Sequence, residues 1–165
     1  MMNRERNHIV SLNAGERILV DTCSLIEGNR YKSIFSKVTC LVLPQTYREL
    51  SRVVAKRREL CCNMSTISAE TIEESYEVQI EARRLYRKYG LLWGLSYVDC
   101  LYIASAKIGD VPLMSCDRAL LKVAEKEGVR IIPMHLHGKQ MISIVISKVT
   151  CENVASISKS EEDKK

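Results

Sequence analysis

Four acidic side chains from well-separated segments could together carry out metal-dependent chemistry. They are Asp21, Glu49, Asp99 and Asp117. Asp21 and Asp117 directly follow apolar runs that are typical of strands, and Glu49 lies one helical turn after a third such run. Asp99 lies in the first turn of a predicted helix. Functional groups of open α/β sheets gather where strands end and lead into helices, so we expect the four carboxylates to converge at one edge of a sheet.

A cluster of carboxylates suits Mg²⁺ or Mn²⁺, because these hard cations prefer oxygen ligands and keep several waters. A metal held in this way can activate a water and neutralise charge on a phosphoryl transition state. Each acid also has a structural interpretation. Asp21 and Asp117 could cap helices, Asp99 forms an S-x-x-D pattern with Ser96, and Glu49 could be an exposed residue near a helix N-terminus. Asp21 and Asp99 lie beside apolar residues, where an uncompensated carboxylate is costly, and this favours the functional interpretation of the set.

The composition limits the classes of protein to consider. A length of 165 residues allows one ordinary domain with short extensions, and an apolar share of 46% excludes wholesale disorder. The net charge of +5 fits a polyanionic partner. No stretch approaches the roughly 18 apolar residues of a membrane helix, and no apolar core of a secretory signal is visible. We therefore expect a cytoplasmic protein with no membrane association.

The seven cysteines show neither a C-x-x-C pair nor a grouping with zinc-ligand spacing. Several stand inside apolar runs, as Cys40 does, where cysteine behaves as a small hydrophobic residue. Buried free thiols are the favoured interpretation. A disulfide that uses Cys61 or Cys62 remains an alternative.

Short apolar runs alternate with helical patterns along most of the chain. Strands are predicted over residues 17–20, 39–43, 111–115 and 129–132. Helices are predicted over residues 47–60, 69–89, 96–108 and 118–127, with a loop at 63–68 and with Gly90, Gly109 and Gly128 as stops. Residues 141–149 could form a strand or a helix. The alternation predicts an α/β fold with a parallel sheet and crossover helices.

The four acidic segments resemble those of the PIN-domain family, and in particular its VapC-type toxin ribonucleases. The matching stretches are VDTCSLI, TYREL, SYVDCLYIASA and LMSCDRALLKVAEKEGVRII. Their order and spacing agree with the family over residues 17–134. The resemblance implies a three-layer α/β/α sandwich with a central parallel sheet over these residues. Residues 1–16 would then be a polar leader, and residues 135–165 a C-terminal extension with a charged, frayed tail.

The resemblance also implies an activity, which is Mg²⁺- or Mn²⁺-dependent cleavage of single-stranded or structured RNA by an endoribonuclease, and it suggests the toxin of a toxin–antitoxin pair. It assigns metal binding and catalysis to Asp21, Glu49, Asp99 and Asp117. Thr22 and Ser115 match family hydroxyl residues with supporting roles, Ser115 orienting the last carboxylate or a metal-bound water. A homodimer is expected, and so is an antitoxin that covers the acidic pocket with a basic side chain.

Two positions depart from the family pattern. Cys23 stands where many relatives have Ser or Asn, so a polar contact to the site would be lost, and Ala119 stands where many place a further Asp. These departures leave open a catalytically silent module that binds RNA or a protein. A PIN nuclease of ribosomal RNA processing or RNA decay is another alternative. A phosphatase or phosphoacceptor domain is weaker, because it would not require Glu49 and Asp99 beside Asp21.

Basic residues flank two of the acids. Arg48 and Arg52 are close to Glu49 in the sequence, and Arg118 follows Asp117. Such side chains could hold RNA phosphates near the metal, and binding would then weaken as salt increases. The competing interpretation is that these residues are only a solvated helix face.

Overall fold

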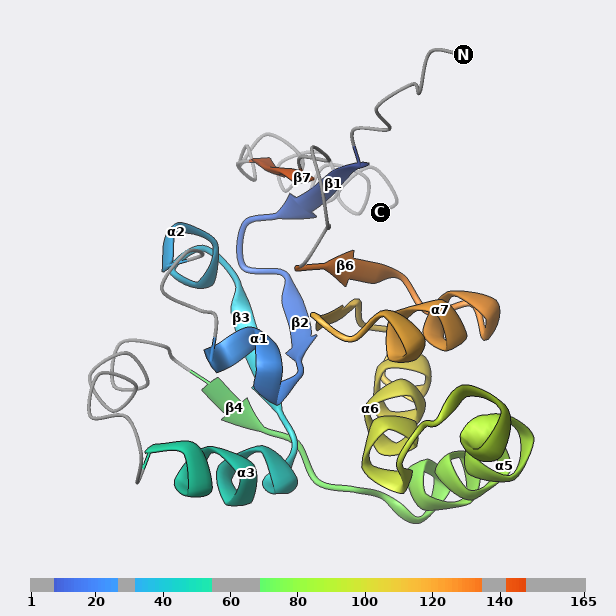
Figure 1. Ribbon diagram of the computed structural model, residues 1–165. Helices are drawn as coiled ribbons and strands as arrows, with labels where there is room; N and C mark the ends of the chain where they lie inside the picture. The colour runs from blue at the N-terminus through green and yellow to red at the C-terminus, as the bar shows by residue number, and fades with distance from the viewer. Residues whose placement is uncertain (1–7, 27–31, 55–68, 135–141, 148–165) are drawn as a thin grey trace, which may run out of the picture.

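The computed structural model describes residues 8–26, 32–54, 69–134 and 142–147. Its centre is a five-stranded parallel sheet in the order β4-β3-β2-β5-β6 (Figure 1). The strands are β2 (Arg17–Val20), β3 (Thr39–Val42), β4 (Ala69–Thr71), β5 (Leu113–Ser115) and β6 (Ile131–Pro133). The helices are α1 (Thr22–Ile26), α2 (Lys32–Phe35), α3 (Pro44–Val54), α5 (Tyr76–Trp93), α6 (Tyr97–Ile108) and α7 (Arg118–Lys126).

The helices cover both faces of the sheet, because the strands are apolar on both sides. Alternate side chains of a strand point to opposite faces. Leu19, Leu41 and Leu113 therefore pack against α5, α6 and α7. Val20 and Met114 pack into the second core, with α1, α2 and α3. The result is the expected α/β/α sandwich, and Figure 1 shows the two groups of helices on either side of the sheet.

Three predicted helix boundaries were wrong: the start at residue 69, the stop at Gly90 and the start at residue 47. Residues 69–71, predicted as the start of a helix, form the edge strand β4, which pairs with β3. A three-residue strand is too short to show an alternating pattern, and the charged residues after it extended the helical pattern backwards. Helix α5 begins only after Ser75, whose Oγ accepts the Val78 N–H.

Gly90 does not end α5 as predicted. The helix continues to Trp93 and ends at Gly94, which adopts a φ of 65°. Gly90 is instead a packing position, because a Cβ there would lie 2.8 Å from the Tyr86 ring. At the other predicted boundary, Pro44 is the first residue of α3, where its fixed φ is compatible with a helix and its missing N–H is not needed. The rest of the predicted helix 47–60 and the predicted loop 63–68 lie outside the described residues.

A second, two-stranded sheet joins segments that are far apart in the sequence. Strand β1 (His8–Asn13) pairs in parallel with β7 (Ile142–Ser147) (Figure 1). Strand β1 lies within the predicted polar leader, and β7 shows that the apolar run after residue 141 forms a strand. Leu12 of β1 is buried in the same core as Met134, so this small sheet is packed onto the main domain.

A network of charged residues fastens α5, α6 and α7 to one another. Glu127, at the C-cap of α7, accepts hydrogen bonds from Lys88 at 3.0 Å, Tyr89 at 2.7 Å and Lys107 at 3.0 Å. Arg84 donates to the same carboxylate. Burial opposes ionisation of Glu127, but these hydrogen bonds outweigh it and hold its pKa well below the usual range. The network therefore fixes α6, which carries Asp99, and α7, which directly follows Asp117.

No described helix has the length and apolar character needed to span a membrane.

Glu127→Gln should lower the free energy of unfolding at pH 7 by about 2 kcal/mol, because it removes a charged acceptor from four donors. The folded pKa lies below the unfolded one, so the contribution is present above the unfolded value near 4.5 and is lost as the pH falls below it. Urea unfolding at pH 7 and in acid measures both effects. The exposed neighbour Glu125 gives the matched control Glu125→Gln, and equal losses in the two variants would contradict the assignment.

Candidate functional site

Asp21 lies at the carboxyl end of β2 and is only 9% exposed. Its Oδ2 accepts hydrogen bonds from Ser115 Oγ at 2.7 Å and from Cys23 Sγ at 3.0 Å. Burial and the neighbouring Cys23 thiol raise the pKa of Asp21 to about 8, although the Ser115 hydrogen bond opposes the shift. Among the residues that the structure describes, no basic side chain forms an ion pair with this carboxylate. A buried acid of this kind is suited to a bound cation, which would restore its ionised form.

Ser115 connects Asp21 to Asp117. Strands β2 and β5 are neighbours in the sheet, so their carboxyl ends bring the two acids to the same corner. The buried Ser115 Oγ donates to Asp21 and accepts the N–H of Asp117 at 3.0 Å. Ser115 therefore contacts the carboxylate of Asp21 and the backbone of Asp117, and its expected role in orienting the last carboxylate or a metal-bound water stays a prediction.

The Asp117 carboxylate caps α7. Its Oδ1 accepts the N–H groups of Ala119 at 2.7 Å and of Leu120 at 3.0 Å. Asp99 has a similar arrangement at the start of α6, where it forms a complete capping box with Ser96. Asp99 and Asp117 therefore both cap helices, as the structural interpretation of the sequence predicted. Capping by one carboxylate oxygen also fixes the side chain in place.

A buried hydroxyl network, which the sequence analysis missed, links the segments that carry the other acids. The phenol of Tyr102, 1% exposed, lies 2.6 Å from Thr46 Oγ1 and 3.2 Å from Thr22 Oγ1. Thr22 follows Asp21 in the chain. This contact ties the start of α1 to α6, and the supporting role of Thr22 at the metal site stays a prediction.

The other two residues of the network lie one helical turn from an acid. Thr46 precedes Glu49 by three residues on α3, and Tyr102 follows Asp99 by three residues on α6. Residues three apart share a helix face, and this spacing was the signal that could have revealed the network. Burial, together with the charges of Asp21 and Glu49, raises the pKa of Tyr102 to about 12, which is consistent with both carboxylates lying near the phenol.

Cys23 keeps a hydrogen-bonding role at the position where the sequence analysis expected a lost contact. Its Sγ donates to Asp21 and accepts the N–H of Cys116 at 3.1 Å. The sulfur also lies 3.6 Å from Ser115 Oγ. The side chain therefore supports Asp21 as a hydroxyl group would, at the longer distances of sulfur.

The structure connects two of the predicted acids, Asp21 and Asp117, and does not arrange the four as a closed metal centre among the described residues. Asp21 and Asp117 meet through Ser115, and Glu49 and Asp99 lie one turn from the Tyr102 network. Within the described ranges, no three side chains of His, Cys, Asp or Glu are grouped closely enough to hold a metal ion. The oxygen donors and the uncompensated Asp21 fit Mg²⁺ or Mn²⁺, and the four-carboxylate centre stays a prediction.

The three predicted RNA-binding residues are all exposed. Arg48 and Arg52 lie on α3, which also carries the half-buried Glu49, and Arg118 is the first residue of α7. In the described part of the chain none of the three forms an ion pair. Their side chains are thus exposed cations, and RNA binding by them stays a prediction.

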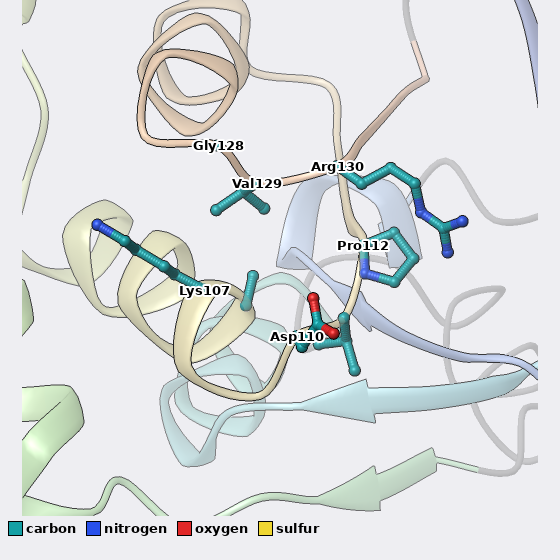
Figure 2. A pocket seen from close by; sticks show the side chains of 8 residues that line it. Lys107, Asp110, Pro112, Gly128, Val129 and Arg130 are labelled. Carbon is teal, nitrogen blue, oxygen red and sulfur yellow. The ribbon is translucent and has the colours of Figure 1, made fainter.

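A cavity of about 360 Å³ lies away from the acids, beside the end of α6 and the start of β5 (Figure 2). Its lining includes Lys107, Asp110 and Arg130, but none of the four predicted acids. Lys107 is already bound to Glu127, and Arg130 pairs with Glu16. Figure 2 shows the Arg130 side chain turned away from Asp110. The cavity offers no group that the predicted chemistry needs.

Comparison with known proteins places this geometry in a family. The family model of the PIN domain matches residues 18–126, which is more than half of the chain. No curated protein matches the sequence.

Two solved structures share the fold at low identity. VapBC2 from Rickettsia felis, bound to a DNA fragment from its promoter, is 16% identical with a TM-score of 0.52, and the match covers 71% of this chain and 98% of that one. A domain of a functionally unknown protein from Methanocaldococcus jannaschii is 17% identical with a TM-score of 0.50, and the match covers 76% and 96% of the two chains. At these identities the likeness establishes the fold.

Asp21→Asn should stabilise the metal-free protein at pH 8 by on the order of 1 kcal/mol, because the amide keeps an acceptor for Ser115 and carries no buried charge. The folded pKa near 8 exceeds the ordinary value of 3.8, so wild-type stability should fall as the pH rises between the two. Thermal unfolding in a chelator at pH 5 and pH 8 measures the difference. Asp110→Asn, at an exposed position, is the control, and an unchanged pH dependence in Asp21→Asn would contradict the prediction.

Proposed function

This chain belongs to the PIN-domain family, whose members are nucleases, and from that premise we propose that it is a Mg²⁺- or Mn²⁺-dependent endoribonuclease. The observation that carries the proposal is Asp21: a buried carboxylate, held by two side-chain donors, without an ion pair among the described residues, beside a second acid. Burial disfavours the ionised form of this carboxylate, and a bound cation would offset that penalty.

The metal would be held by Asp21, Glu49, Asp99 and Asp117. When bound, it supplies an activated water and neutralises charge on the phosphodiester during hydrolysis. Ser115 and Cys23 both donate to Oδ2 of Asp21 and so fix the orientation of that carboxylate. Asp117 is fixed by its cap on α7, and Asp99 by its capping box. The protein's own contribution is thus to hold acids in place before the cation arrives, which reduces reorganisation during the reaction.

Single-stranded or structured RNA is the proposed substrate. Arg48, Arg52 and Arg118 lie on the elements that carry or follow two of the acids, where they can neutralise phosphates next to the metal. The net charge of +5 favours the approach of a polyanion. Binding is therefore expected to be electrostatic and largely independent of sequence.

We further propose that the protein is the toxin of a toxin–antitoxin pair. The support is the fold shared with VapBC2 of Rickettsia felis, which was solved with promoter DNA. An antitoxin would cover the acidic site with a basic side chain, and the toxin would act as a cytoplasmic homodimer. Residues 17–134 would form the nuclease domain. A role in ribosomal RNA processing or RNA decay uses the same chemistry and is the alternative pathway.

A catalytically silent PIN-like module is the second candidate. One observation favours it: Asp99 and Asp117 act as helix caps, a role that requires no metal. The two candidates differ in Mn²⁺ binding, which calorimetry measures directly. Heat of binding at millimolar Mn²⁺ that is lost in Asp21→Asn supports the nuclease, whereas no binding supports the silent module.

Asp21→Asn should reduce Mn²⁺-dependent cleavage of a single-stranded RNA by roughly a hundredfold or more, the scale of losing one electrostatic stabiliser of a transition state. Cleavage by the wild type should stop when a chelator removes the metal. Asp110→Asn, which lies outside the acidic site, should cleave at the wild-type rate. Full activity of a folded Asp21→Asn variant would refute the mechanism.

Arg48→Ala and Arg52→Ala should each weaken RNA binding, and should each reduce the slope of log affinity against log salt by about 0.7 for a single strand. Fluorescence anisotropy of a labelled RNA over a series of salt concentrations measures the slope. Arg83→Ala provides the control, because Arg83 is an exposed cation on α5 rather than on α3. If all three variants lose the same amount, the effect reflects net charge rather than a phosphate contact at the site.

A further inference from the structure

Two thiols meet beside Asp21. Cys23 Sγ accepts the Cys116 N–H at 3.1 Å, and Cys116 Sγ lies 3.9 Å from the hydroxyl of Ser24, the next residue after Cys23. A hydrogen bond with the Cys116 side chain, together with burial, raises the pKa of Cys23. The Cys23 sulfur therefore packs against Cys116 at the corner where β2 and β5 end, and the Cys116 thiol lies beside the residue that follows Cys23.

The rest of the fold keeps this contact in place. The pairing of Leu19 with Leu113 and of Val20 with Met114 aligns β2 with β5, so the residues that follow the two strands stay opposite each other. Cys23 and Cys116 are both reduced and only half-buried. Cys40 and Cys100, by contrast, are fully buried in the core.

We propose that Cys23 and Cys116 form a reversible disulfide that disables the carboxylate site. The inference rests on the proposed function, because it assigns a regulatory modification to the same site. The oxidant is a hydroperoxide such as hydrogen peroxide. One thiol is oxidised to a sulfenic acid with release of one water, and the second thiol then displaces a second water as the S–S bond forms. Two thiols lose two hydrogens and two electrons, and one peroxide becomes two waters.

The disulfide would remove a hydrogen-bond donor from Asp21. Cys23 supplies one of the two side-chain donors to Oδ2, and a disulfide sulfur has no proton to donate. Formation of the S–S bond also requires the two sulfurs to approach to about 2.05 Å, which draws α1 towards the end of β5. Both changes act on the carboxylate that would bind the cation, so oxidation should weaken metal binding and a thiol reductant should restore it.

The full-length protein allows a direct test of the bond by peptide mapping. After treatment with hydrogen peroxide and blocking of remaining thiols, trypsin should release residues 18–30 linked to residues 108–118, because basic residues stand at 17, 30, 107 and 118. Dithiothreitol should separate the two peptides. The linked species should be absent from Cys116→Ser. Finding residues 18–30 joined only to other peptides, or oxidised only to sulfinic acid, would overturn the proposal.

A second measurement tests the consequence for the site. The Mn²⁺-induced rise in the unfolding temperature should be lost in oxidised wild type, return with dithiothreitol, and persist through peroxide treatment in Cys116→Ser. Persistence of the rise in fully cross-linked wild type would refute the regulatory role. The regulatory proposal and the nuclease proposal can fail separately. If no cross-link forms, the nuclease proposal is unaffected. If the reduced protein neither binds Mn²⁺ nor cleaves RNA, the nuclease proposal is refuted even where the cross-link forms.

Discussion

The buried phenol of Tyr102 is the contact on which the acidic site depends. It is shared by Thr22 and Thr46, so a single hydroxyl holds α6 against both α1 and α3. Each of the three segments also carries one of the predicted acids. Buried polar groups that are fully satisfied make a unique packing arrangement, because any alternative leaves one of them without a partner. The position of three acids relative to one another is therefore a property of the core rather than of surface loops.

Ser115, the last residue of β5, makes a second buried hydroxyl contact near Asp21. Its hydroxyl both donates and accepts, and it joins the side chain of Asp21 to the backbone of Asp117. Aspartates that cap helices and a serine that bridges two strands are ordinary structural devices. Here they fix the side chains of Asp99 and Asp117 at helix starts and join Asp21 to the backbone of Asp117. The structural and functional interpretations of these residues are compatible, since a cap occupies only part of a carboxylate.

Much of the fold was predictable from local patterns, and the failures have physical causes. The strands that follow a clear apolar run, β2 and β3, were found because burial on both faces makes them continuously apolar. The edge strand β4 was missed because it has only three residues and polar neighbours. The strand β1 was missed because polar and apolar residues are mixed in the segment before residue 17. The acids at strand ends were identifiable from their positions, whereas the Tyr102 network required knowing which helices face each other. Local sequence cannot supply that information.

The charged network around Glu127 has a mechanical consequence for the acids. It fastens α6 near its last turn, at Lys107, and α7 at its C-cap, whereas Asp99 and Asp117 stand at the opposite, amino-terminal ends of these helices. A helix of 12 residues such as α6 is a lever of about 18 Å. If the helix were fastened at Lys107 alone, a rotation of about 5° would move its amino-terminal end by about 1.5 Å, and the contacts of Tyr102 with Thr22 and Thr46 oppose that movement. Helix α6 is thus fastened at two points, at Lys107 and at Tyr102, and two points of attachment restrict the tilt that would displace Asp99.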